Sequence, residues 1–130
     1  DNYFTFHLKN IKEFFLKNKE TTIGLYDVKD LNEAKRFGVV SIDSEGLVRE
    51  FEEKPENPKS TLVSTAIYFF PGEIKEWIDE FLSKTGKADQ PGRLIKYLVE
   101  NKRVYGVVLD GEWYDIGTID TYRELFYRTM

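Results

Sequence analysis

The sequence contains no cysteine, so disulfide bonds and zinc sites built on thiolates are excluded. It has a single histidine, His7, so a metal centre made of several histidines is excluded and its serines lack the pattern of a hydrolase triad. No apolar run reaches the ~20 residues that a membrane-spanning helix requires, and no export or lipidation motif is present. Acidic residues outnumber basic ones, 23 to 19, which argues against general nucleic-acid binding. We therefore expect no membrane or nucleic-acid partner and take the cytoplasm as the default location.

Glycine is present but not in the pattern of a phosphate-binding loop. None of the nine glycines forms a Gly-x-Gly pair, so no strand–Gly loop–helix unit for a triphosphate is predicted. The chain also begins at Asp1 rather than at a methionine. We interpret it as a piece of something longer.

Hydrophobic residues make up 41% of the 130 residues, enough for the packed core of one domain spanning 1–130. Apolar spacing and breaker residues predict helices and strands in alternation. The predicted helices are 7–19, 74–82 with Gly86 as a stop, 94–99 and 119–128. The predicted strands are 21–28, 37–42, 47–53, 62–70 and 104–109, and 29–36, 87–92 and 111–118 are predicted as loops, the first with a possible helical turn. The second and third strands form a hairpin around Asp43–Gly46, and 62–70 is predicted as a central strand buried on both faces. The fold class is α/β, a layered domain with a mixed sheet.

Glu53-Lys54-Pro55 stands where a strand must end. Lysine is a compact cation suited to a phosphate, and Glu53 is suited to accept hydrogen bonds from sugar hydroxyls. The alternative is a charged strand end in solvent.

Two acids far apart in the sequence, Asp1 and Asp115, are candidate metal ligands. Mg²⁺ prefers one or two carboxylates together with substrate phosphates. Asp115 lies among aromatic and apolar neighbours, but a turn or helix-capping role is equally open. Asp1 is either a second carboxylate or part of a frayed terminus.

Five segments, in order, resemble the sugar-1-phosphate nucleotidylyltransferases, most of all the glucose-1-phosphate thymidylyltransferases. They are Asp1-Asn2, Phe37-Gly38-Val39-Val40, Glu53-Lys54-Pro55, Thr65-Ala66-Ile67-Tyr68-Phe69 and Trp113-Tyr114-Asp115-Ile116-Gly117-Thr118. The resemblance implies a three-layer αβα, Rossmann-like fold. It also implies transfer of a nucleotidyl group: a sugar-1-phosphate oxygen attacks the α-phosphorus of a nucleoside triphosphate, pyrophosphate leaves, and an NDP-sugar forms.

The same resemblance implies a role for six residues. Asp1 and Asp115 would hold Mg²⁺, Lys54 would hold the sugar phosphate as the catalytic cation, and Glu53, Gly38 and Thr65 would bind or line the sugar. No protein nucleophile is required, because catalysis rests on positioning and charge neutralisation.

The sequence departs from the family at three places. The family's Gly-x-Gly-x-Arg signature, which binds the triphosphate, is absent. The resemblance therefore implies the C-terminal, sugar-phosphate-binding half of a catalytic domain, inactive alone, which associates with itself or with the missing N-terminal half. Ala66 stands where the family usually has glycine, and Asp89–Arg93 stands where the family has an acidic stretch. The resemblance therefore does not determine which sugar or which nucleotide base is used. The alternatives are a non-catalytic sugar-phosphate-binding or regulatory module, and a structural domain with solvated motifs.

Overall fold

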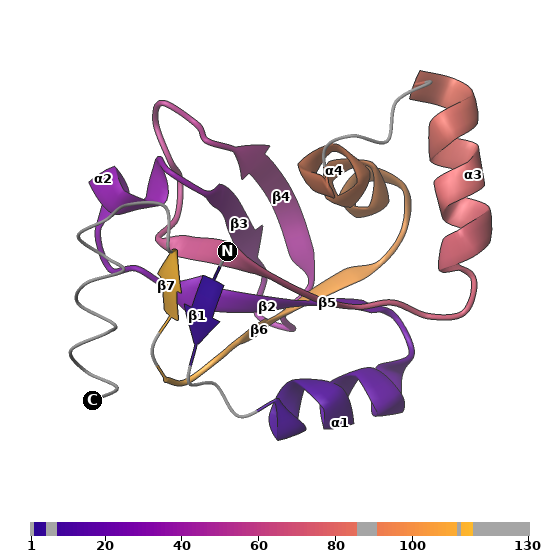
Figure 1. Cartoon of the computed structure of the whole chain (residues 1–130), viewed down its shortest axis with the longest axis horizontal. Helices are drawn as coiled ribbons and strands as arrows, with labels where there is room; N and C mark the ends of the chain where they lie inside the picture. The colour runs from indigo at the N-terminus through magenta and orange to yellow at the C-terminus, as the bar shows by residue number, and fades with distance from the viewer. Residues whose placement is uncertain (1, 5–7, 86–90, 112, 116–130) are drawn as a thin grey trace.

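The computed structural model describes residues 2–4, 8–85, 91–111 and 113–115 (Figure 1). Five strands form the main sheet: β2 (Thr21–Asp27), β3 (Gly38–Ile42), β4 (Val48–Glu53), β5 (Leu62–Phe69) and β6 (Val104–Val108). Their order is β4-β3-β5-β2-β6, with β2 parallel to β6 and the other neighbours antiparallel. The predicted mixed sheet, with the 62–70 strand at its centre, is confirmed.

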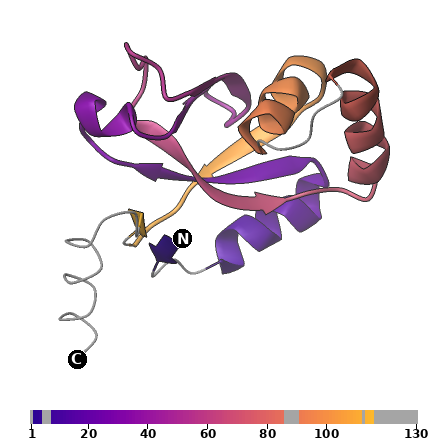
Figure 2. The same cartoon turned by 45° about the horizontal axis from the view of Figure 1, so that its top comes forward.

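Helices cover both faces of this sheet (Figure 2). The described ones are α1 (Lys9–Asn18), α2 (Leu31–Ala34), α3 (Ile74–Thr85) and α4 (Pro91–Asn101). Toward α4, a buried cluster joins Ile23, Leu25 and Phe51 to Ile95 and Leu98. A second cluster on the opposite face contains Ile11, Ala34, Val39, Val63 and Leu109. Each fully buried aliphatic side chain contributes about 1.5–3 kcal/mol, so the two clusters hold three layers together.

Local signals set the ends of the first two helices. α1 ends at Lys19, which takes the left-handed conformation with φ 55° and donates its N–H to the carbonyl of Phe15 at 2.6 Å. α2 begins after Asp30, whose carboxylate accepts from the N–H of Asn32 at 2.8 Å. α4 starts at Pro91, three residues before its predicted first residue, because proline suits the first turn of a helix.

The β3–β4 hairpin turns where the sequence predicts it. Oδ1 of Asp43 accepts from the N–H groups of Glu45 at 2.9 Å and Leu47 at 3.0 Å, and Gly46 has φ 85°. The tip also reaches β6, since the N–H of Gly106 donates to the carbonyl of Gly46 at 2.8 Å. The turn therefore anchors the hairpin across the sheet.

A bulge interrupts the pairing of β2 with β5. Ile23 pairs with Tyr68 and Leu25 with Ser64, so three residues of β5 lie opposite the single residue Gly24. At the middle of these three, Ala66 has φ 64°, a conformation that favours glycine. Ala66 is exposed, so β5 is central but not buried along its whole length, contrary to the prediction.

Two short strands, β1 (Asn2–Phe4) and β7 (Trp113–Asp115), form a separate antiparallel pair, side by side in Figure 1. The prediction of a loop over 111–118 is wrong at β7, because a three-residue strand shows no readable alternation. The helix predicted over 119–128 lies outside the described residues. Within the described part of the chain, no helix is long and apolar enough to span a membrane.

Candidate functional site

Lys54 lies at the point where β4 leaves the sheet. Its φ is 46°, and its N–H donates to the carbonyl of Phe37 at 3.0 Å. A left-handed conformation costs a non-glycine residue about 1–2 kcal/mol, so the surrounding structure holds this strained corner in place. The side chain is exposed and forms no ion pair with another described residue. Its charge therefore remains available to an anion.

Glu53 precedes Lys54 and lies opposite Gly38 in the β3–β4 register. Two glycines approach its carboxylate. A Cβ atom added to Gly38 would lie 3.3 Å from Oε2 of Glu53, and one added to Gly92, in the first turn of α4, would lie 2.6 Å from the same oxygen. The ring of Phe51, buried on the same face of β4, borders both glycines. The structure thus brings Gly38, Glu53 and Lys54 together.

Tyr68 is a neighbour of this site that the sequence analysis did not single out. It is partly buried on the α4 side of β5, and its phenol oxygen accepts from Oγ of Ser64 at 3.4 Å. Burial raises the pKa of Tyr68, and the negative charge of Glu53 raises it further, against the opposing hydrogen bond from Ser64. The phenol therefore stays protonated at neutral pH and can donate a hydrogen bond. The available signal was alternation along β5, which puts Tyr68 on the face of Phe51 and Glu53.

Thr65 is placed differently from the other predicted sugar residues. Its side chain is 1% exposed, and Oγ1 donates to the carbonyl of Gly24 at 2.8 Å. Its neighbours there are Leu109 and Ile67, on the sheet face away from α4. The hydroxyl of Thr65 thus ties β5 to β2 at the bulge, and its sugar-binding role remains a prediction.

The candidate metal ligands lie at the β1–β7 pair. The register aligns Asn2 with Asp115, so the residue that follows Asp1 in the chain is opposite Asp115. Asp1 itself lies outside the described residues. Among those described, no three acidic, histidine or cysteine residues gather as a metal site. Mg²⁺ binds few protein ligands besides substrate oxygens, so the pair Asp1 and Asp115 stays a prediction.

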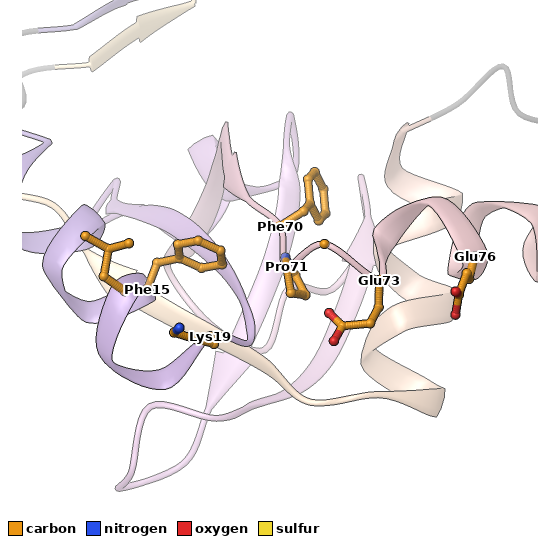
Figure 3. A pocket seen from close by; sticks show the side chains of 8 residues that line it. Phe15, Lys19, Phe70, Pro71, Glu73 and Glu76 are labelled. Carbon is orange, nitrogen blue, oxygen red and sulfur yellow. The ribbon is translucent and has the colours of Figure 1, made fainter.

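A hollow of about 610 Å³ lies elsewhere, between the end of α1 and the start of α3 (Figure 3). Phe15 and Phe70 line it, with Lys19 toward one side and the acids Glu73 and Glu76 toward the other. None of the predicted site residues lines it. We therefore place the candidate site at the Glu53–Lys54 corner, where Gly38 also lies.

Comparison with known proteins decides the family. A family model described as nucleotidyl transferase matches residues 1–130. The chain belongs to the nucleotidyl transferase family. A glucose-1-phosphate adenylyltransferase of Thermosipho africanus is 38% identical over 113 residues, which is 83% of this chain and 26% of the relative. The bifunctional protein GlmU of Methanocaldococcus jannaschii is 39% identical over 106 residues, 81% of this chain and 25% of the relative.

The fold of this nucleotidyl transferase chain also matches a solved structure. A Bacillus anthracis protein assigned as a glucose-1-phosphate thymidylyltransferase, crystallised with sucrose, superimposes with a TM-score of 0.80 at 25% identity. The match covers 100% of this chain and 52% of that one. The resemblance to sugar-1-phosphate nucleotidylyltransferases and the Rossmann-like αβα fold are therefore confirmed. The chain spans about a quarter of the length of the curated relatives it matches.

Proposed function

We propose that this chain supplies the sugar-phosphate-binding part of an enzyme that joins a sugar 1-phosphate to a nucleoside triphosphate and releases pyrophosphate. The observation that carries the proposal is the β4 corner. There Glu53 and Lys54 present an acceptor and a cation side by side, beside the protonated phenol of Tyr68. A phosphorylated, hydroxylated ligand matches that set of groups, and family membership supplies the reaction class.

Each group has a distinct task in this proposal. Glu53 accepts hydrogen bonds from sugar hydroxyls, and the ammonium of Lys54 neutralises the phosphate whose oxygen attacks the nucleotide. The left-handed backbone at Lys54 sets the direction in which its side chain leaves β4. Gly38 is buried beside the ring of Phe51, and its lack of a side chain leaves room for the carboxylate of Glu53. No step requires a nucleophile from the protein.

We also propose that Asp1 and Asp115 hold Mg²⁺. When bound, the ion offsets negative charge on the triphosphate. The support is the alignment of Asn2 with Asp115 in the β1–β7 register. Replacing Asp115 with Asn should raise the Mg²⁺ concentration needed for half-maximal rate. An unchanged Mg²⁺ requirement would contradict the assignment.

The reaction is tested by pyrophosphate release from the natural protein that carries this sequence, at its full length. A panel of nucleoside triphosphates is combined with the 1-phosphates of glucose, galactose, mannose and N-acetylglucosamine. Lys54→Ala should lower kcat/KM about 10–100-fold, because one charge-assisted hydrogen bond contributes about 1.5–3 kcal/mol. Lys12→Ala, an exposed lysine on α1, is the matched control and should leave the rate unchanged. Equal rates for both variants would refute the proposed site.

A non-catalytic sugar-phosphate-binding module is the second candidate. This candidate uses only the acceptor and the cation at the β4 corner, which lie in the 130 residues given. We infer that the 130-residue chain binds sugar phosphate without turnover. Binding without pyrophosphate release by the full-length protein would favour the module, and release would exclude it.

The partners of this chain are also a matter of proposal. We propose that it associates with a second copy or with further chain, because β4 and β6 lie at the edges of the described sheet and an edge strand can pair with another strand. Light scattering across protein concentrations tests self-association of the 130-residue chain. A monomer at every concentration would contradict that part.

A further inference from the structure

The Glu53 carboxylate lies in a slot between β3 and α4. Oε2 of Glu53 is 3.3 Å from the position that a Cβ of Gly38 would occupy and 2.6 Å from the corresponding position at Gly92. The ring of Phe51, which is 4% exposed, lies 2.7 Å and 3.6 Å from the same two positions. The carboxylate of Glu53 therefore occupies space that a side chain at Gly38 or Gly92 would fill.

The two glycines differ in what a methyl group would displace. At Gly38 it would meet the ring of Phe51, which is buried in the core and has nowhere to move. At Gly92 it would meet first the carboxylate of Glu53, the far end of a flexible and exposed side chain. Gly92 also lies within α4 without a left-handed φ, so its backbone accepts alanine. A methyl group at Gly92 thus moves the carboxylate and leaves the fold intact.

We propose that Gly92 is a positioning residue for sugar-phosphate recognition, and that it acts by leaving the space in which Glu53 is held. The inference rests on the proposed role of Glu53 in binding sugar hydroxyls. It extends the site from the β3–β4 hairpin to the first turn of α4, a segment that the sequence comparison with the family marked as different. It also implies that the residue at position 92 tunes how far the carboxylate reaches toward the sugar.

The test compares Gly92→Ala with Gly72→Ala in the full-length protein. Gly72 is the control because a Cβ there meets nothing within 4 Å. Calorimetric titration with glucose 1-phosphate should show about tenfold weaker binding for Gly92→Ala, the loss of one charge-assisted hydrogen bond, and unchanged binding for Gly72→Ala. The melting temperature of Gly92→Ala should equal or exceed that of the wild type. Unchanged affinity of Gly92→Ala would overturn the inference.

A second substitution separates displacement of Glu53 from other effects. Glu53→Asp alone should weaken binding, because the shorter carboxylate falls back from the sugar. Added to Gly92→Ala, the same change should restore part of the lost affinity, because the shorter side chain avoids the methyl group. If the losses of affinity from the two substitutions simply add in the double variant, the methyl group at position 92 does not act by displacing the Glu53 carboxylate. Glu53→Gln tests the proposed function separately: if it binds glucose 1-phosphate as tightly as the wild type, the role of Glu53 fails, whatever Gly92→Ala does.

Discussion

Replacing Ala66 with glycine should stabilise the protein, against the usual effect of glycine in a strand. Ala66 has φ 64° at the centre of the β5 bulge. The left-handed conformation costs an L-residue about 1–2 kcal/mol, and glycine avoids that cost. Glycine also destabilises the folded state by about 0.4–1 kcal/mol, because it gives the unfolded chain more conformational freedom. The methyl group of Ala66 is exposed, so little packing is lost.

The net expectation for Ala66→Gly is a gain of about 0.5–1 kcal/mol in the free energy of unfolding. Urea unfolding of the full-length protein measures it as a higher midpoint at an unchanged slope. Calorimetry should show a melting temperature higher by about 2–4 °C. Ala66→Val is the opposing variant and should destabilise, because a branched side chain tolerates positive φ poorly.

The reasoning on Ala66 fails if Ala66→Gly lowers the midpoint while Ala66→Val leaves it unchanged or raises it. That result would mean that residue 66 is extended in solution and that glycine merely weakens the strand. The bulge itself would then be in doubt, together with the placement of Thr65 on the face away from α4.

Three further predictions follow from buried or hydrogen-bonded groups. Oγ1 of Thr21 is buried without a hydrogen-bond partner among the described residues. Thr21→Val should therefore raise the free energy of unfolding, measured by urea denaturation, by about 1 kcal/mol. A lower free energy of unfolding would mean that the hydroxyl has a hydrogen-bond partner. The pKa of Asp43 is lowered: desolvation alone would raise it, but the amide groups of the turn and Arg49 outweigh that effect. The stabilisation that ionised Asp43 provides is therefore complete above pH 3.8 and is lost as the pH falls through the lowered pKa. The stability difference between wild type and Asp43→Asn should therefore shrink in acid, and a constant difference would contradict this. Glu53→Gln should lower the pKa of Tyr68, measured by NMR titration, while burial still keeps that pKa above 10.0. An unchanged pKa would mean that the charge of Glu53 does not act on Tyr68.

Much of the fold followed from patterns that are local in the sequence. The five strands of the main sheet alternate or run apolar over five to eight residues, and Pro71-Gly72 and Gly46 mark breaks that the structure retains. The stripe that begins at Ile74 identified α3 for the same reason. The short strands β1 and β7 could not be predicted, because their pairing joins residues at opposite ends of the chain.

The candidate site was predictable only in part. The position of Lys54 before Pro55 indicated a corner, and the structure adds its left-handed backbone. Family order predicted Thr65, but motif position alone does not reveal that a bulge turns its hydroxyl toward Gly24. Gly92 was not singled out as a site residue, because its approach to Glu53 depends on how α4 packs over β4. Contacts between distant elements carry no local signal.

The central claim is that the Lys54 corner holds the phosphate of a sugar phosphate. Its most direct test is calorimetric titration of the full-length protein with glucose and with glucose 1-phosphate, in the wild type and in Lys54→Ala. The wild type should bind the phosphorylated sugar more tightly than the free sugar. Lys54→Ala should lose most of that preference while keeping its affinity for glucose. An undiminished preference for the phosphorylated sugar in Lys54→Ala would contradict the claim.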